Sequence, residues 1–522
     1  MEYRTSPNKN VFIYDFFLKN LRPYFWISAL SFLLYSKALS FGYSYLDDNV
    51  LILNSHQFIS KLSNIFETFR IPDIVSKHSY YRPLLTVSLI LDAQFGGKEL
   101  FFYHLSNVIF HIIASSLVFK LLTKMGYSRG VSLFFGLVFC SHPALANPVV
   151  WIPGRADVIL AIFSLGAFIF FLDFLKTQNR LAFLGHLVFF SLALLSRENA
   201  LAIPIVCVCY LLLIEKERTF SLRQGFLAAG WALVILLWFF LREAVLTEQL
   251  HYSVVNAAKS LFMGIPALVQ YFGKAVFPFN LSVLPNIKDT TFVWGLSALF
   301  LLVFALLFSK DKRTRFIIFG AIWFLIFLSL CFIKPSADVS ANFLEHRLYP
   351  AFFGLVLVFL EIDFIKRLEF RRPAAVFIGA LFLLFFSGIT FTYSENYRDR
   401  IKFWNNAVKT SPQSPLAHKN LGAMYYLDGL MDKAETEYKK SLQLNPMEPM
   451  VHNNLGLIYA KRGKLNEAEA EYKKEITINP EYDDVYFNLG LLYYGQGKTK
   501  EAERLWRKTL QINPDYPGIR YN

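Results

Sequence analysis

The chain has 522 residues, of which 55% are hydrophobic and 17% aromatic, including 55 Phe. Soluble domains are usually about 45–50% apolar, so this composition indicates a membrane protein. The net charge of +14 does not favour nucleic-acid binding, because the Lys and Arg residues are not gathered on one strip, and many lie in short loops between apolar runs.

The first apolar run, at about 24–42, is long enough to span a membrane. It lacks a clear small-x-small cleavage site, with "YSKALS" as a weak candidate, so we expect a retained anchor rather than a signal peptide. All four cysteines fall inside apolar runs, which favours buried small hydrophobic side chains over a disulfide framework or a zinc site. They are Cys140, Cys207, Cys209 and Cys331.

Eleven apolar runs approach the ~20 residues that a membrane helix needs. They predict an all-α, polytopic membrane helix bundle over residues 1–393, with a long loop at 43–102. The count is open where two short runs are closely linked, at 182–197 and 199–214. The runs are 24–42, 103–122, 131–150, 156–175, 182–197, 199–214, 225–241, 291–308, 316–333, 347–361 and 374–393.

Basic residues in alternate loops predict the orientation of the bundle. With a cytoplasmic N-terminus, every inner loop carries at least two Lys or Arg, as membrane proteins usually show. An odd number of spans then places loop 43–102 and the C-terminus on the outer side. The inner loops are "KMGYSR" (124–129), "KTQNR" (176–180), "EKERTFSLR" (215–223), "KDKRTR" (310–315) and "DFIKRLEFRR" (363–372).

One further apolar segment, 256–278, contains Lys259 and Lys274. If it spanned the membrane, the loop "KDKRTR" would lie outside. We therefore expect an interfacial or re-entrant helix there.

The C-terminal part is built from repeats of 34 residues. "NLG" occurs at 420–422, 454–456 and 488–490, and "NP" follows at the same spacing. Small residues, aromatics and a closing Pro at fixed positions are typical of tetratricopeptide repeats. We predict a junction with half a repeat at 394–414 and three repeats at 415–522. The recurring sets are Gly422, Tyr425, Ala434, Tyr438 and Pro446; Gly456, Tyr459, Ala468, Tyr472 and Pro480; and Gly490, Tyr493, Ala502, Trp506 and Pro514. Such a solenoid suits peptide or protein binding, with homo-oligomerisation or a structural cap as alternatives.

Asp47 and Asp48 in "YSYLDDNVLILN" follow the first predicted span directly. They could belong to a solvated loop that merely ends a helix. Alternatively, one carboxylate could accept a proton from an attacking hydroxyl, or the pair could engage a cation. Adjacent side chains of an extended segment point in opposite directions, so one base with one orienting partner is the more plausible form.

Four arginines lie in predicted outer segments, against the usual charge bias of membrane proteins. Each could be an interfacial side chain whose charged end reaches water. Each also lies beside an acid or a proline in a short turn, and a guanidinium donates two parallel hydrogen bonds to a phosphate. Together they suggest a cleft for a phospholipid-linked substrate. They are Arg82, Arg155, Arg197 and Arg347, in "YYRPL", "IPGRAD", "LSREN" and "LEHRLYP".

His104, Asn107 and His111 share one helix face at i, i+3 and i+7. Polar residues in membrane helices normally face the bundle interior or a cavity. Two His separated by two turns are too far apart for ordinary shared metal ligation, so we interpret them as packing and hydrogen-bonding residues.

The order of these motifs resembles one family. The outer "DD", then "YRPL", "FYHLSNVIFHIIASSLVF", "HPALANPVVWIPGRADVIL", "LSREN" and "HRLYP", with the repeats behind them, are similar to the transmembrane and tetratricopeptide repeat-containing proteins. Those are protein O-mannosyltransferases, and many bacteria carry relatives. The resemblance covers nearly the whole chain.

The resemblance implies a C-type glycosyltransferase fold and inverting transfer from a polyprenyl- or dolichyl-phosphate sugar. Carried onto this chain, Asp47 would be the general base and Asp48 its acidic neighbour. The donor-phosphate ligands would be Arg82, Arg155, Arg197 and Arg347, and the possible substrate-pocket residues would be His104, His142, Asp157, Glu198 and His346. No cofactor is required, and a divalent cation is possible but not favoured.

The chain departs from the family in its short solenoid and in "SREN", where Lys-Glu is expected. The sugar, the acceptor and the exact phosphate ligand therefore stay open. A protein Ser or Thr is the favoured acceptor; the alternatives are a glycan or lipid acceptor and a non-enzymatic scaffold that displays the repeats. The bacterial inner membrane is favoured over the endoplasmic reticulum, with the repeats periplasmic or lumenal.

Overall fold

The computed structural model describes residues 16–74, 80–216, 221–246, 254–332, 343–370 and 372–518. The chain folds as an all-α protein in two compact units, Met1–Asp399 and Arg400–Asn522. The main helices of the first unit are α2 (Arg22–Tyr35), α4 (Pro83–Gly96), α5 (Phe101–Lys124), α6 (Arg129–Ser141), α7 (Asn147–Val150), α8 (Arg155–Thr177), α9 (Arg180–Ser196), α10 (Ala202–Tyr210), α11 (Leu222–Val245), α12 (Val254–Val276), α13 (Val293–Phe308), α14 (Thr314–Ser329), α15 (Leu348–Phe359), α16 (Asp363–Lys366) and α17 (Pro373–Ser394).

A helix lies in each of the eleven predicted apolar runs. Among the described residues, six helical segments are long and apolar enough to cross a membrane, or seven if a bent pair counts as one span. Three further apolar helices are shorter, namely α4, α9 and α13. The first unit is therefore a multi-pass helix bundle with about six or seven candidate spans, and eleven crossings stay a prediction.

The predicted run 131–150 is a broken helix rather than a straight one. The chain bends by 60° between α6 and the segment Pro143–Val150. Pro143 cannot continue the hydrogen-bond ladder of α6. His142 covers the break, because its Nδ1 accepts a hydrogen bond from the Ala144 N–H at 3.2 Å and its Nε2 lies 3.0 Å from the Ala275 carbonyl oxygen.

The predicted loop 43–102 contains more regular structure than its composition suggests. It includes the apolar helix α4 and the short helix α3 (His56–Ile59). Leu51, Ile52 and Ile59 form a buried cluster with Leu89 and Ile90 of α4. The segment that follows Asp48 is thereby fixed against the bundle instead of lying free in solvent.

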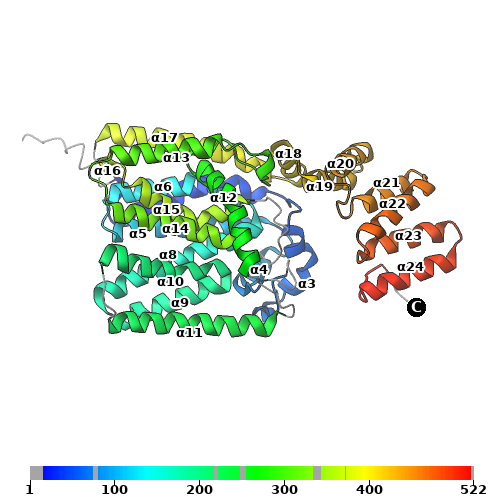
Figure 1. Cartoon of the computed structure of the whole chain (residues 1–522), viewed down its shortest axis with the longest axis horizontal. Helices are drawn as coiled ribbons and strands as arrows, with labels where there is room; N and C mark the ends of the chain where they lie inside the picture. Colours follow the sequence, from blue (N-terminus) through cyan, green and yellow to red (C-terminus); the bar gives the residue numbers. More distant parts are fainter. Residues whose placement is uncertain are drawn as a thin grey trace, which may run out of the picture. The chain divides into compact units, whose positions relative to one another are not determined.

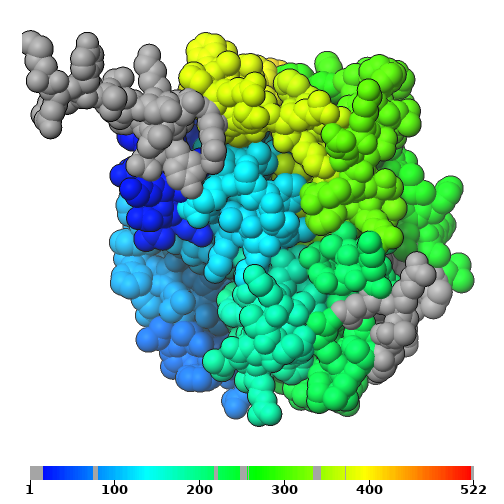
Figure 2. Space-filling model, turned by 90° about the vertical axis from the view of Figure 1, so that its left-hand side faces the viewer, coloured from blue at the N-terminus to red at the C-terminus, as the bar shows by residue number. Residues whose placement is uncertain are grey.

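The two ends of the bundle hold different loops. α16 lies at one end of the long helices and α3 and α4 lie at the other (Figure 1). At the α16 end, chain segments far apart in the sequence lie side by side (Figure 2). Loops predicted to be on the inner side meet here; for example, Lys124 pairs with Asp173, and Arg223 donates to the Leu175 carbonyl.

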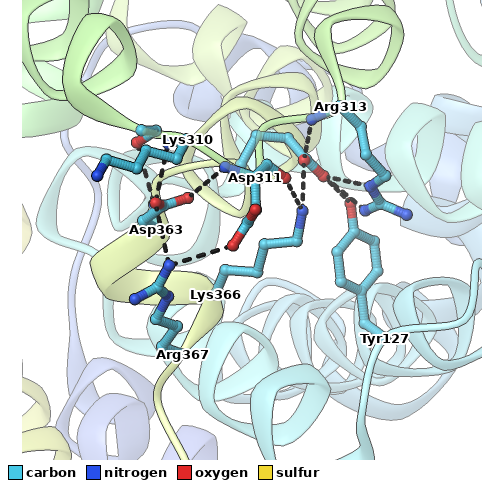
Figure 3. Close-up of polar contacts among 9 residues, drawn as sticks. Tyr127, Lys310, Asp311, Arg313, Asp363, Lys366 and Arg367 are labelled. Atoms are coloured by element: carbon cyan, nitrogen blue, oxygen red, sulfur yellow. Dashed lines mark hydrogen bonds and ion pairs between the residues drawn. The ribbon is translucent and has the colours of Figure 1, made fainter.

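A buried glutamate joins three of these loops. The Glu361 side chain is 0% exposed and accepts hydrogen bonds from Arg313 Nε at 2.9 Å, Lys366 Nζ at 3.2 Å and the Tyr127 hydroxyl at 3.2 Å. Figure 3 shows how Arg313, Lys366 and Tyr127 converge from separate segments. This contact anchors the end of α15 that lies away from Arg347.

The helices α14 and α15 approach closely at two glycines. A Cβ atom at Gly320 would lie 2.6 Å from the Gly354 carbonyl oxygen, and one at Gly354 would lie 2.6 Å from the Phe324 nitrogen. Small residues allow such backbone contact between membrane helices. The contact fixes the position of α15, which begins directly after Arg347.

The second unit is a stack of helix pairs, as the repeats predict. Its helices are α18 (Arg400–Thr410), α19 (Pro415–Leu427), α20 (Met431–Leu444), α21 (Val451–Lys461), α22 (Leu465–Ile478), α23 (Asp483–Gly495) and α24 (Thr499–Ile512). Side chains at Gly422, Gly456 and Gly490 would overlap the rings of Tyr438, Tyr472 and Trp506 respectively. The same glycine–aromatic contact therefore closes each of the three pairs.

We predict that Gly354→Ala lowers the stability of the bundle by about 1–3 kcal/mol, because the added methyl group must push α14 and α15 apart. Gly388→Ala in α17 is the control, since a Cβ atom there meets nothing within 4 Å. Thermal unfolding of both purified variants in detergent measures the difference. Equal unfolding temperatures would contradict the proposed close contact.

Candidate active site

Asp48 fixes the turn that carries the acidic pair. Its Oδ2 accepts hydrogen bonds from the Ser44 N–H at 2.6 Å and the Ser44 hydroxyl at 2.7 Å. Its Oδ1 accepts from the N–H groups of Tyr45 at 2.9 Å and Asn49 at 2.8 Å. Burial raises the pKa of Asp48 to about 6, although these hydrogen bonds lower it. With both oxygens occupied, Asp48 is suited to holding the loop rather than to taking a proton.

Asp47 is placed differently from its neighbour. Its backbone is in the left-handed region, with φ at 67°, and its carboxylate is half-buried with no hydrogen bond or ion pair to the described residues. Burial and the negative charge of Asp73 raise its pKa above the ordinary 3.8. A half-buried carboxylate with free oxygens and a raised pKa is a suitable general base.

Three of the predicted arginines meet in one charged cluster. Arg82 pairs with Glu198 at 3.0 Å, and Arg197 pairs with Asp157. The charge of Asp157 also interacts with Arg82 and Arg347. These residues come from the start of α4, the start of α8, the α9–α10 turn and the turn η11 (Glu345–Arg347), which are far apart in the sequence.

His346 completes this cluster as a neutral side chain. Its Nε2 lies 3.7 Å from Asp157 Oδ2, and its ring packs against Trp151 with the ring centres 5.3 Å apart. Burial, together with Arg197, Arg347 and Arg82, lowers the pKa of His346 well below 6.5. The contact with Asp157 would favour protonation, but burial and three nearby cations oppose it more strongly.

Several buried polar atoms of the cluster have no hydrogen-bond partner among the described residues. Buried polar groups are normally paired, so a group of orphan atoms in one place indicates a site for a polar ligand. Both Nε and Nη1 of Arg347 are in this state, which leaves that guanidinium open for an oxyanion. The orphan atoms are Asp157 Oδ1, Arg197 Nε, Glu198 Oε1, His346 Nδ1, Arg347 Nε and Arg347 Nη1.

The structure does not bring Arg155 into this cluster. Its guanidinium is 0% exposed, contacts Asp92 at 2.5 Å and donates to the Tyr103 carbonyl at 2.7 Å. Arg155 and Asp157 are two residues apart on one helix, so they point to different sides of it. Arg155 therefore binds α8 to α4 and α5, and we no longer assign it to the phosphate.

The two other predicted pocket histidines, His142 and His104, make their contacts outside the cluster, as does His111. His142 uses both ring nitrogens at the break after α6. His104 is buried in α5 and packs edge-on against Phe41, with the ring centres 6.2 Å apart. His111 bonds to the Tyr349 hydroxyl at 2.6 Å and the Cys140 carbonyl at 2.9 Å, which agrees with a packing role.

Sequence reasoning missed two acids of this region. Asp73 is buried and interacts electrostatically with both Asp47 and Arg82. Asp92 is the partner of Arg155. Their common signal is an acid within the same predicted loop, 43–102, as the acidic pair. No group of three or more His, Cys, Asp or Glu side chains suited to a metal occurs in the part of the chain that the structure describes.

We predict that Asp48→Asn and Asp47→Asn separate the two roles. Asp48→Asn should cost about 1–3 kcal/mol, because its amide nitrogen would face hydrogen-bond donors on either side. Asp47→Asn should leave stability unchanged, since Asn tolerates the left-handed backbone. Thermal unfolding in detergent is the measurement. An equal loss of stability in both variants would contradict these separate roles of Asp47 and Asp48.

Comparisons with known proteins found matches to the C-terminal repeats and to the rest of the chain. Family models described as "TPR repeat" and "Tetratricopeptide repeat" match residues 456–497 and 484–516. The repeat pattern of the C-terminal unit is thus confirmed. A crystal structure of MamA aligns with 23% of this chain and 70% of that chain at 25% identity, with a TM-score of 0.21.

Curated relatives are protein O-mannosyl-transferases. One from Caenorhabditis elegans is 24% identical over 396 residues, which are 71% of this chain and 54% of the relative. One from Drosophila melanogaster is 30% identical over 34% of this chain and 21% of its own length, and one from Homo sapiens is 29% identical over 35% and 23%. The chain spans about half the length of the first relative and less of the others. It is a relative of the protein O-mannosyl-transferases of the transmembrane and tetratricopeptide repeat-containing family, with tetratricopeptide repeats at its C-terminal end.

Proposed function

We propose that this chain is a membrane glycosyltransferase that moves a sugar from a polyprenyl-phosphate donor to an acceptor hydroxyl. The observation that carries the proposal is the cluster of Arg82, Arg197 and Arg347 with its orphan polar atoms. The similarity to protein O-mannosyl-transferases supports the same reaction class. A Ser or Thr hydroxyl of a protein is the acceptor that fits both the relatives and the repeats.

The charge of the cluster fits such a donor. The three guanidinium groups face two carboxylates, those of Asp157 and Glu198, and His346 is neutral. Asp73 also interacts with Arg82, so the charges of the cluster nearly balance, and the guanidinium of Arg347, with two atoms that lack hydrogen-bond partners among the described residues, is the group open to the single negative charge of a phosphodiester donor. When the bond from the sugar C1 to the phosphate oxygen breaks, the leaving phosphate gains a second negative charge, and guanidinium donors stabilise it.

Asp47 supplies the base in this proposal. Its carboxylate takes the proton of the acceptor hydroxyl while the hydroxyl oxygen attacks the sugar C1 from the side opposite the phosphate. The C1 configuration is inverted, and polyprenyl phosphate leaves. The activation is already in the lipid phosphate, so the reaction needs no nucleotide. Asp48 acts indirectly by fixing the turn through its four hydrogen bonds.

We propose that the reaction takes place on the non-cytoplasmic side of the membrane, with the repeats in the same compartment. The basic loops at the α16 end support an inner position for that end. Tetratricopeptide repeats commonly bind peptides, so the second unit is suited to holding the acceptor protein. A reporter fused after Asn522 should therefore be protected from cytosolic protease.

The main test is transfer by the purified full chain with a panel of polyprenyl-phosphate sugars, read by acceptor mass. Asp47→Asn should lower the rate by about 10²–10⁴, the usual contribution of a general base. Arg347→Gln should lower kcat/KM for the donor by about 10²–10³. Arg367→Gln, an exposed arginine at the other end of the bundle, should match the wild type. Undiminished transfer by Asp47→Asn would remove the catalytic assignment and favour a scaffold.

We also predict a pH shift from Asp73. The ionised form of Asp47 is the base, so activity falls as the pH drops through its pKa, which the negative charge of Asp73 raises. Asp73→Asn removes that charge, lowers the pKa of Asp47 and moves the acid limb of kcat/KM to lower pH. Profiles of both proteins with one donor measure the shift. An unmoved limb would mean that Asp47 is not the titrating base.

A further inference from the structure

We propose that Lys274 of α12 is a positioning residue for the phosphate site. Through an ion pair with Glu345 it fixes the turn η11, which carries His346 and Arg347. Lys274 does not itself contact the ligand in this proposal. The inference rests on the proposed function for the identity of the ligand, a lipid-linked phosphate.

The ion pair lies inside the bundle. Lys274 Nζ is 2.5 Å from Glu345 Oε1, and the two side chains are only 3% and 1% exposed. The ammonium also donates to the Asn280 carbonyl at 2.6 Å. Lys274, one of the two lysines in the predicted interfacial segment 256–278, is therefore neutralised within the protein.

Glu345 is held from two further directions. The Ser282 N–H donates to its Oε1 at 2.9 Å, and the Tyr393 hydroxyl of α17 donates to its Oε2 at 2.8 Å. Tyr393 is in turn 3.2 Å from the Tyr397 hydroxyl, to which Asn147 donates at 2.6 Å. A buried charge is stable only when it is paired and hydrogen-bonded, and this network satisfies both oxygens of the carboxylate.

A second hydrogen bond from α12 holds the chain just before the turn η11. The Tyr271 hydroxyl donates to the Leu344 carbonyl at 2.8 Å, one residue before Glu345. In a 3₁₀ turn, successive side chains point about 120° apart. With Glu345 directed into the α12 network, His346 and Arg347 are directed elsewhere, and both interact with the Asp157 cluster. The placement of Arg347 thus depends on where α12 holds Glu345.

A purely structural ion pair is the competing explanation, and the chain offers a matched control for it. Glu361 follows the other end of α15, is equally buried, and is paired with Arg313 and Lys366. No residue of the Asp157 cluster neighbours it in the sequence. Loss of Glu361 should weaken the bundle without displacing Arg347.

The experiment compares Lys274→Met with Glu361→Gln in full-length protein reconstituted in lipid nanodiscs. We measure KM and kcat for the sugar donor, binding of polyprenyl phosphate alone, and the unfolding temperature. Lys274→Met should raise the donor KM and the polyprenyl-phosphate Kd at least tenfold. Glu361→Gln should leave both within twofold, although its unfolding temperature also falls.

Tyr393→Phe gives a second measurement if Lys274→Met does not fold. It removes one hydroxyl from Glu345 and should raise the same two constants about three- to fivefold with little change in unfolding temperature. The inference is overturned if both variants keep wild-type KM and Kd. It is equally overturned if Glu361→Gln weakens donor binding as much as Lys274→Met does.

The measurement of polyprenyl-phosphate binding distinguishes a failure of this inference from a failure of the proposed function. A wild-type protein that binds polyprenyl phosphate but transfers no sugar would contradict the proposed reaction, while the effect of Lys274→Met on Kd would still test the positioning role. A wild-type protein that does not bind polyprenyl phosphate at all would overturn the inference itself.

Discussion

The structure of this bundle depends on one constraint, which is that a charged side chain can be buried only together with a partner. An isolated ion inside a low-dielectric core costs several kcal/mol, so each buried charge must meet an opposite charge or several hydrogen bonds. The pairs Arg155–Asp92, Lys274–Glu345 and Arg313–Glu361 meet this requirement and connect helices that are distant in the sequence. The Asp157 cluster meets it less completely, because six of its buried polar atoms lack partners among the described residues, against one, Arg155 Nε, in those three pairs. That difference separates the candidate site from the framework around it.

The framework and the site share one element. The helix α15 has a buried glutamate at each end, Glu345 before it and Glu361 after it, and it contacts α14 through Gly354. Arg347 directly precedes this helix. A guanidinium that binds phosphate must be held close to its productive position, because a loose supporting shell weakens a site even when every ligand residue is present. Fixing the start of this short helix through Glu345 and its side through Gly354 meets that demand, while Glu361 stabilises the far end.

The fold was largely predictable because its signals are local. A helix lies in each of the eleven predicted apolar runs, and a period of 34 residues predicts the repeats. The bend after α6 was missed although Pro143 is visible, because a proline within an apolar run can kink a span or end it. The helix α4 was missed because its 14 residues are too few to cross a bilayer. The site was predictable in part: Arg82, Arg197 and Arg347 gather with Asp157, but Arg155 has another partner. Which arginine meets which acid depends on packing between distant segments, and the sequence alone does not contain that information in readable form.

The left-handed backbone at Asp47 limits which residues could ever occupy that position. Asparagine and glycine suit such a backbone but cannot take up a proton as a carboxylate does. Glutamate keeps the acid, yet it lacks the short side chain that makes aspartate tolerant of positive φ, and it would carry its oxygens one methylene further from the turn. Aspartate satisfies both demands at once. A turn shaped in this way would make selection for chemistry and selection for backbone geometry coincide at a single codon.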